Sequence, residues 1–193
     1  MLRRKRDFKP DRTGTSLLSK LYVTPRQRRL LLKWGVIALL TLALSLAQDV
    51  ILCRVSILGA STDLVAAGIL LLSVLLPTDD GAIFALVAST VYYFSGSSPG
   101  SYCILLLTAL GIAANILRAN LLRRGFASNL LCAAAAMLVY EMLVYVLVLF
   151  LGYTTLSRMY AFGITAALSC AAMVVLYPLF SAACRIGGDS WKD

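Results

Sequence analysis

The sequence predicts an all-α integral membrane protein, built as a bundle of about six transmembrane helices. Sixty per cent of the 193 residues are hydrophobic and only 14% are charged, whereas soluble chains carry roughly 25% charged residues. Uncharged apolar stretches recur along the chain with short polar breaks between them, and basic residues gather before the first stretch. All three observations therefore indicate a helical bundle in a membrane.

Each apolar stretch is a predicted membrane-spanning helix. The stretches are Leu30–Ala47, Asp63–Leu76, Gly81–Phe94, Tyr102–Leu117, Phe126–Leu151 and Met159–Cys184. About 20 helical residues cross the roughly 30 Å hydrocarbon layer of a bilayer. The third stretch is short and is expected to cross with little tilt or with local thinning of the bilayer.

The basic residues predict the orientation of these helices. Eleven of the 18 lysines and arginines lie at or before Lys33. With six crossings and a cytoplasmic N-terminus, sixteen basic residues are cytoplasmic and only Arg54 and Arg158 are outside. If Gly81–Phe94 did not cross, the counts would become twelve and six. The positive-inside rule therefore favours six crossings with both termini in the cytoplasm.

The domain organisation follows from the same pattern. Residues 1–29 are predicted to be a disordered, basic cytoplasmic segment, 30–184 the transmembrane domain, and 185–193 a short cytoplasmic tail. The basic segment indicates either attraction to anionic membrane lipids or a plain topogenic signal, and not a nucleic-acid footprint. Pro77–Asp80 is expected to be a tight turn, and Ser95–Ser101 an outer loop.

The sequence contains no recognisable catalytic or metal-binding motif. Its five cysteines are scattered without a CxxC spacing, and it has no histidine. We therefore expect no metal, no cofactor and no enzymatic activity, with the cysteines packed as small apolar residues.

Glu141 is the sharpest candidate for a functional residue, because it lies near the middle of the fifth apolar stretch. An ionisable group at that depth costs about 2.5–3.5 kcal/mol and should face the bundle interior or a cavity. Two interpretations stay open. Glu141 either binds a ligand or a partner helix, or it forms an interhelical hydrogen bond that only stabilises the bundle.

Other polar residues are expected to organise the helices. Thr108, Gly111, Asn115 and Arg118 recur at spacings of three and four, which places them on one helix face, and Asn115 is a candidate to pair with Glu141. The preferred interpretation is that these polar residues stabilise contacts between helices.

Small residues and the outer ends of spans give further candidates. Gly81, Ala85 and Ser89 form a small-residue face that lets another helix approach closely. Asp63 is expected near the outer interface as a cap of the second span. Gln48 lies at the outer end of the first span, where it can be solvated. We expect Gln48, Asn115 and Glu141 to fix the internal arrangement.

Several motifs together resemble the rod shape-determining protein MreD family. Leu46-Ala47-Gln48, then Ile57-Leu58-Gly59 and Thr62-Asp63-Leu64, are similar to that family's first-span glutamine, linker and start of the second span. Leu75-Leu76-Pro77 is similar to the family's turn, and Gly81-Ala82-Ile83-Phe84 to its third span. The outer loop of the family resembles Ser95–Gly100, and its fifth span resembles the stretch that begins at Tyr140-Glu141. Departures are Thr62 in place of proline, Tyr92 or Tyr93 in place of aspartate, and Ala85 and Ser89 in place of glycines.

The resemblance implies a non-enzymatic scaffold of the cell-elongation machinery in the bacterial cell membrane. Such a protein would bind the single-span partner MreC, and through it MreB filaments and the peptidoglycan polymerase and transpeptidase. The family fold is similar to the S-component of energy-coupling-factor transporters, so the alternative is a subunit that binds a vitamin or another small molecule. In that case Tyr92, Tyr93, Tyr102 and Tyr153 would line a pocket; otherwise they form an interfacial aromatic belt, which is the preferred interpretation.

Overall fold

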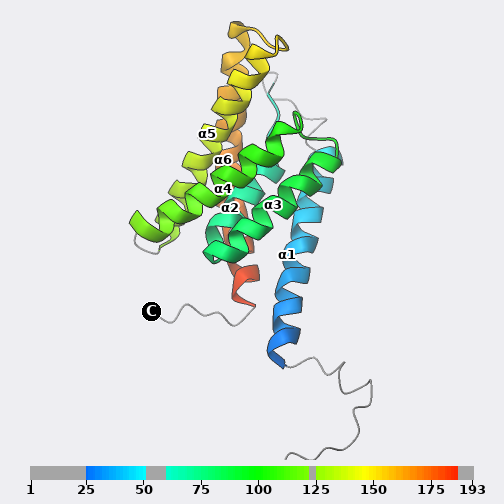
Figure 1. Ribbon diagram of the computed structural model, residues 1–193, viewed down its shortest axis with the longest axis vertical. Helices are drawn as coiled ribbons and strands as arrows, with labels where there is room; N and C mark the ends of the chain where they lie inside the picture. Colours follow the sequence, from blue (N-terminus) through cyan, green and yellow to red (C-terminus); the bar gives the residue numbers. More distant parts are fainter. Residues whose placement is uncertain (1–24, 51–59, 122–124, 187–193) are drawn as a thin grey trace, which may run out of the picture.

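The computed structural model describes residues 25–50, 60–121 and 125–186, and this part of the chain is helical (Figure 1). The elements are α1 (Pro25–Val50), α2 (Leu64–Leu75), α3 (Thr78–Phe94), α4 (Tyr102–Leu121), α5 (Phe126–Phe150), the 3₁₀ turn η3 (Leu156–Arg158) and α6 (Met159–Arg185). The predicted all-α class is confirmed for the described residues.

Four of these helices are long and apolar enough to cross a membrane, namely α1, α4, α5 and α6. The other two are shorter, with 12 residues in α2 and 17 in α3. The prediction of a membrane protein is therefore supported by four helices, and α2 and α3 need a separate explanation.

The first helix begins earlier than predicted, at Pro25 instead of Leu30. Proline suits the first turn of a helix because its fixed φ is helical and its missing N–H would lack a partner there. Residues 25–29 are thus helical, and the prediction of disorder is wrong for them. Residues 1–24, Cys53, Arg54, the Ile57–Gly59 motif, Arg123, Arg124 and the 187–193 tail lie outside the described residues.

Helix α2 is the centre of the molecule, in contact with the other five α-helices. Every residue from Val65 to Leu75 is buried. Gly68 lets its neighbours approach, since a Cβ there would lie 2.8 Å from Leu44 of α1 and 3.5 Å from Phe180 of α6. An apolar helix covered on all sides is the expected result of a sequence that is apolar all round.

The connections between helices lie at two ends of the molecule. The chain just before α2, the α3–α4 loop and the α5–α6 connection all contribute to one cavity. The α2–α3 connection, the end of α4 and the start of α5 lie toward the other end, with the start of α1 and the end of α6 (Figure 1).

The predicted turn at Pro77–Asp80 is wrong in its extent, because α3 already begins at Thr78 with Pro77 as its N-cap. Asp79 and Asp80 belong to the first helical turn, where carboxylates interact favourably with the helix dipole. The predicted contact between α2 and α3 is present. The Ser95–Ser101 loop is also present, and Gly96 adopts a φ of 78° in it.

The small-residue face of α3 packs against neighbouring helices, in agreement with the predicted close approach of another helix. Gly81, Ala85 and Ser89 are buried. A Cβ on Gly81 would lie 2.5 Å from the Ser73 carbonyl oxygen, and a Cβ on Gly111 would lie 3.2 Å from Ala85. Since this face contacts α2 and α4, it is not free to bind a transporter partner.

Candidate functional site

Side chains from three helices hold the N-terminal end of α2. The Gln48 Oε1 atom of α1 accepts a hydrogen bond from Val65 N–H at 2.8 Å. Asp63 Oδ1 accepts from Ala66 N–H at 3.0 Å, and Asp63 Oδ2 accepts from the Tyr92 hydroxyl of α3 at 2.8 Å. The Asp63 backbone N–H donates to Ser169 Oγ of α6 at 3.0 Å. The predicted Asp63 cap is confirmed, and the expectation that Gln48 is solvated is wrong.

Helix α4 holds the opposite end of α2. The Asn115 side-chain amide donates to the carbonyl oxygens of Ser73 at 2.5 Å and Leu76 at 3.1 Å. The Arg118 guanidinium donates to the Val74 carbonyl oxygen. Asn115 therefore stabilises helix packing, as preferred from the sequence. The predicted pairing of Asn115 with Glu141 is wrong, because the amide is committed to α2.

Thr108, which precedes these two residues on the same stripe of α4, contacts α3 instead. Its hydroxyl lies 3.1 Å from Ser89 Oγ and donates to the Ile104 carbonyl oxygen at 2.7 Å. The stripe thus serves two neighbouring helices, α3 at one end and α2 at the other.

The shortness of α2 explains why both of its ends need these partners. Twelve residues rise only about 18 Å, which is less than the roughly 30 Å of hydrocarbon. If α2 lies within the bilayer, the free N–H and C=O groups of its ends need partners in the protein. Asp63 and side chains of α1, α4 and α6 bond to such groups, and Tyr92 of α3 holds the Asp63 carboxylate.

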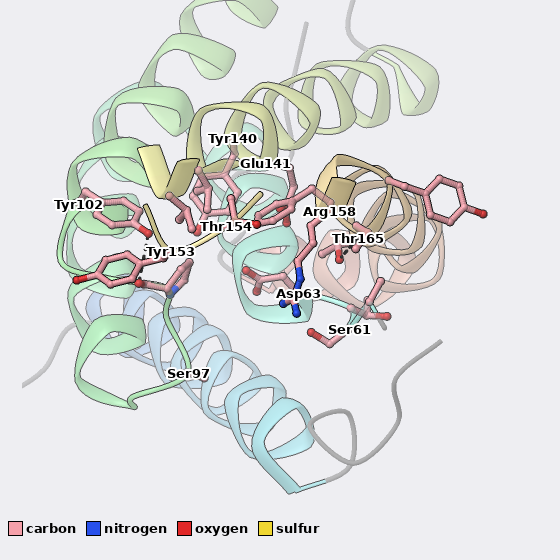
Figure 2. Close-up of a pocket in the computed structure, with 18 of the residues that line it drawn as sticks. Ser61, Asp63, Ser97, Tyr102, Tyr140, Glu141, Tyr153, Thr154, Arg158 and Thr165 are labelled. Atoms are coloured by element: carbon pink, nitrogen blue, oxygen red, sulfur yellow. Dashed lines mark hydrogen bonds between the residues drawn. The ribbon is translucent and has the colours of Figure 1, made fainter. Parts of the chain in front are cut away.

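A cavity of about 860 Å³ opens beside the N-terminal end of α2 (Figure 2). Its wall combines charged, aromatic and hydroxyl side chains from α1, α3, α4, α5 and α6. The polar and aromatic members are Gln48, Ser61, Thr62, Asp63, Tyr92, Ser97, Tyr102, Tyr140, Glu141, Tyr153, Thr154, Ser157, Arg158, Tyr160, Phe162 and Thr165.

Glu141 lies in the wall of this cavity and not in a contact between helices. Its side chain is 6% exposed, and within the described part of the chain its carboxyl group takes part in no hydrogen bond or ion pair. The interhelical hydrogen bond that one interpretation expects is therefore not formed within the described residues. The binding interpretation stays a prediction.

The tyrosines divide between the cavity and the surface. Tyr92, Tyr102 and Tyr153 line the cavity, whereas Tyr93 does not. Tyr92 is buried and bonded to Asp63, so it is not part of an interfacial belt. Tyr153 is 80% exposed and lies at the edge of the cavity.

Sequence reasoning missed several wall residues. Tyr140, buried with its hydroxyl 3.4 Å from Cys103 Sγ, has the same pattern as any core tyrosine. Thr154 and Arg158 follow α5 in a loop, and nothing in their spacing indicates that this loop folds over the cavity. Arg158 is exposed, and Thr154 Oγ1 is buried without a hydrogen-bond partner.

The cavity wall offers charge recognition and hydrogen bonding. Figure 2 shows Asp63, Glu141 and Arg158 reaching the cavity from three different elements, the start of α2, α5 and η3. Gln48 and Asp63 are held by backbone and hydroxyl partners, which fixes this side of the wall.

Comparison with known proteins supplies no relative for this chain. No protein-family model matches it, and neither the curated proteins nor the solved structures contain a significant match.

Proposed function

We propose that the protein is a six-span, non-enzymatic scaffold of the bacterial cell membrane, similar to the MreD family, which assembles cell-elongation proteins. The single observation that carries this proposal is the convergence of the motifs behind the resemblance. Gln48, Asp63, Ser97, Pro99, Tyr140 and Glu141 come from three of the quoted stretches, the first, the Ser95–Gly100 loop and the fifth span, and line one cavity. Chance similarity between apolar helices gives no reason for such convergence.

Six crossings are supported by the placement of the connections. Three connections meet at the cavity, whereas the α2–α3 connection, the end of α4 and the start of α5 lie toward the end that holds the start of α1 and the end of α6. In this arrangement α2 and α3 cross as short helices inside the bundle. The basic residues then lie mainly on the cytoplasmic side, with both termini there.

Lateral surfaces of the bundle are suited to a partner helix in the bilayer. Helix α1 packs mainly against α2 and α6. Its outer face exposes four leucines, Leu31, Leu39, Leu42 and Leu46. Packing in lipid depends on close fit and not on hydrophobic burial, so such a face can accept either lipid or a single-span helix. We propose an MreC-like protein as this partner, which would link the scaffold to MreB filaments and to the peptidoglycan polymerase and transpeptidase.

The scaffold proposal is tested with the variant Glu141→Leu. We expect normal membrane insertion but weaker co-purification of an MreC-like partner and altered cell shape, because the cavity loses its internal carboxyl group. The measurement is affinity purification in detergent from the native host, together with microscopy. Val139→Leu, on an exposed position of the same helix, is the control. Unchanged partner recovery and shape in Glu141→Leu would contradict a role of the cavity in assembly.

The cavity itself favours a second candidate, a ligand-binding subunit similar to a transporter S-component. A volume of about 860 Å³ and a polar, aromatic wall suit a small molecule. Recovery of a bound vitamin and of ATPase subunits in the same purification would support transport instead of scaffolding. The α3 small-residue face is already buried within the chain, so a transporter partner would need another surface.

A further inference from the structure

The buried carboxyl group of Glu141 lacks a partner in the fold. Both Asp63 oxygens accept hydrogen bonds, from Ala66 N–H and from the Tyr92 hydroxyl. Glu141 is 6% exposed, accepts none within the described residues, and faces the cavity. A carboxyl group at this depth is costly unless another group bonds to it. Since Glu141 lines the cavity, a ligand held there is placed to bond with this carboxyl group.

We propose that the cavity binds a small molecule that carries a cationic amine, with its ammonium group between the Glu141 and Asp63 carboxyl groups. The inference goes beyond the scaffold function and does not depend on it. It concerns what the cavity holds, whichever proteins the bundle assembles with.

The distribution of charge selects a cation. Asp63 and Glu141 face the interior of the cavity, and Arg158 is the one basic residue among the described wall residues. The Arg158 side chain is exposed, so water screens its charge, whereas the Glu141 side chain is 6% exposed. Both carboxyl groups line the interior and the basic residue lies nearer the edge, which suits an ammonium group inside and any anionic end of the ligand near Arg158.

The aromatic wall strengthens this selection. Tyr92 and Tyr140 are buried in the wall, and Tyr102 and Tyr153 line it further out. Tyrosine rings attract cations through their faces. Thr154 Oγ1, which is buried without a partner, supplies an additional hydrogen-bonding group. The volume lies within the range of about 300–1,000 Å³ that small-molecule sites occupy.

Two sources supply the same amine chemistry, a free amine and the headgroup of an aminophospholipid. They are distinguished by comparing the protein in nanodiscs of phosphatidylglycerol alone, whose headgroup carries no amine, and in nanodiscs that also contain phosphatidylethanolamine. A lipid headgroup in the site weakens the apparent affinity for a soluble amine in the second preparation. Equal affinities in both preparations indicate a free amine.

The test is calorimetric titration of the full-length protein with putrescine, and with butanediol and succinate of the same carbon-chain length. We expect putrescine to bind more tightly than either analogue. Glu141→Gln should weaken putrescine binding about tenfold or more, because an ion-paired hydrogen bond becomes a neutral one. Asp79→Asn makes the same change on an exposed residue outside the cavity wall and should leave the affinity unchanged.

A second variant keeps the inference falsifiable if Glu141→Gln does not fold. Arg158→Glu changes an exposed residue and makes the cavity edge negative, so it should tighten putrescine binding several-fold. Absence of putrescine binding to the wild type, equal binding of butanediol, or an affinity that neither Glu141→Gln nor Arg158→Glu alters would overturn the proposal.

Discussion

At the scale of single residues, the polar side chains of this apolar bundle have two different roles. Gln48 and Asp63 bond to the backbone at the start of α2 and so stabilise the fold. Glu141 is buried but bonds to nothing within the described residues. Ionisable residues inside a membrane bundle are costly and often functional. Its lack of an internal partner is the reason for proposing that Glu141 binds a ligand.

Gln48→Ala is predicted to destabilise the protein by about 1–2 kcal/mol, because Val65 N–H loses its acceptor in a buried position. Unfolding equilibrium in detergent micelles measures the change. Ser45→Ala on the same helix removes only a bond to its own helix, at the Thr41 carbonyl oxygen, and serves as the control. Equal losses in the two variants would show that the Gln48 bond contributes nothing specific.

At the scale of secondary-structure elements, α2 is notable because neighbouring helices satisfy both of its ends. Asn115 and Arg118 of α4 take up carbonyl groups that an isolated short helix would leave free in lipid. The position of α2 in the bundle is consequently defined by hydrogen bonds to its neighbours.

Asn115→Ala tests this dependence. It should cost about 1–3 kcal/mol, because the carbonyl oxygens of Ser73 and Leu76 lose their shared donor inside the protein. Asn120→Ala, an exposed change one turn further along α4, should stay within about 0.5 kcal/mol of wild type. Thermal unfolding of both purified variants gives the comparison, and similar values for the two would contradict the proposed capping.

Two glycines differ in the space around them, and alanine substitutions at the two are predicted to have opposite effects on stability. Gly81→Ala should destabilise the protein by about 1–3 kcal/mol, since the new Cβ meets the Ser73 carbonyl and the Asn115 amide at 2.5 and 2.6 Å. Gly163→Ala in α6 meets nothing within 4 Å and should stabilise by about 0.5–1 kcal/mol through helix propensity. Detergent unfolding curves measure both, and a tolerated Gly81→Ala would refute the tight contact.

At the scale of the whole molecule, the polar cavity lies at one end of the bundle, beside the α3–α4 loop and the α5–α6 connection. If the bundle crosses six times, the cavity lies on the side away from the basic termini. Its contents would then be exchanged with the extracytoplasmic space, which constrains the source of any ligand.

Single cysteines placed at Ser98, Ser157 and Asp79 test this orientation in a cysteine-free background. An impermeant thiol reagent added to intact cells should label the first two and spare the third, because the first two belong to the connections at the cavity end. Lysed cells, in which all three react, provide the control. Labelling of Asp79→Cys in intact cells would refute six crossings.

Much of the fold was predictable from sequence, because the apolar stretches mark most helices to within a few residues. The capping role of Asp63 and the close packing at Gly81 also followed from residue type and spacing. The hydrogen-bond partners between helices were not predictable. Asn115 was expected to pair with Glu141, whereas its amide bonds to the end of α2. Polar residues on different helices give no sequence signal of their relative depth or rotation, and the approach of Tyr140, Thr154 and Arg158 to one cavity depends on both.

The capping of α2 has a consequence for biogenesis. Helix α2 leaves the ribosome well before α6, yet Ser169 of α6 accepts the bond from Asp63 N–H. More than a hundred residues must be synthesised before this bond can form. During translation the segment is a short apolar stretch with unsatisfied ends, poorly suited to stay in lipid alone. If α2 crosses the membrane, we therefore expect its stable integration to need the completed α6.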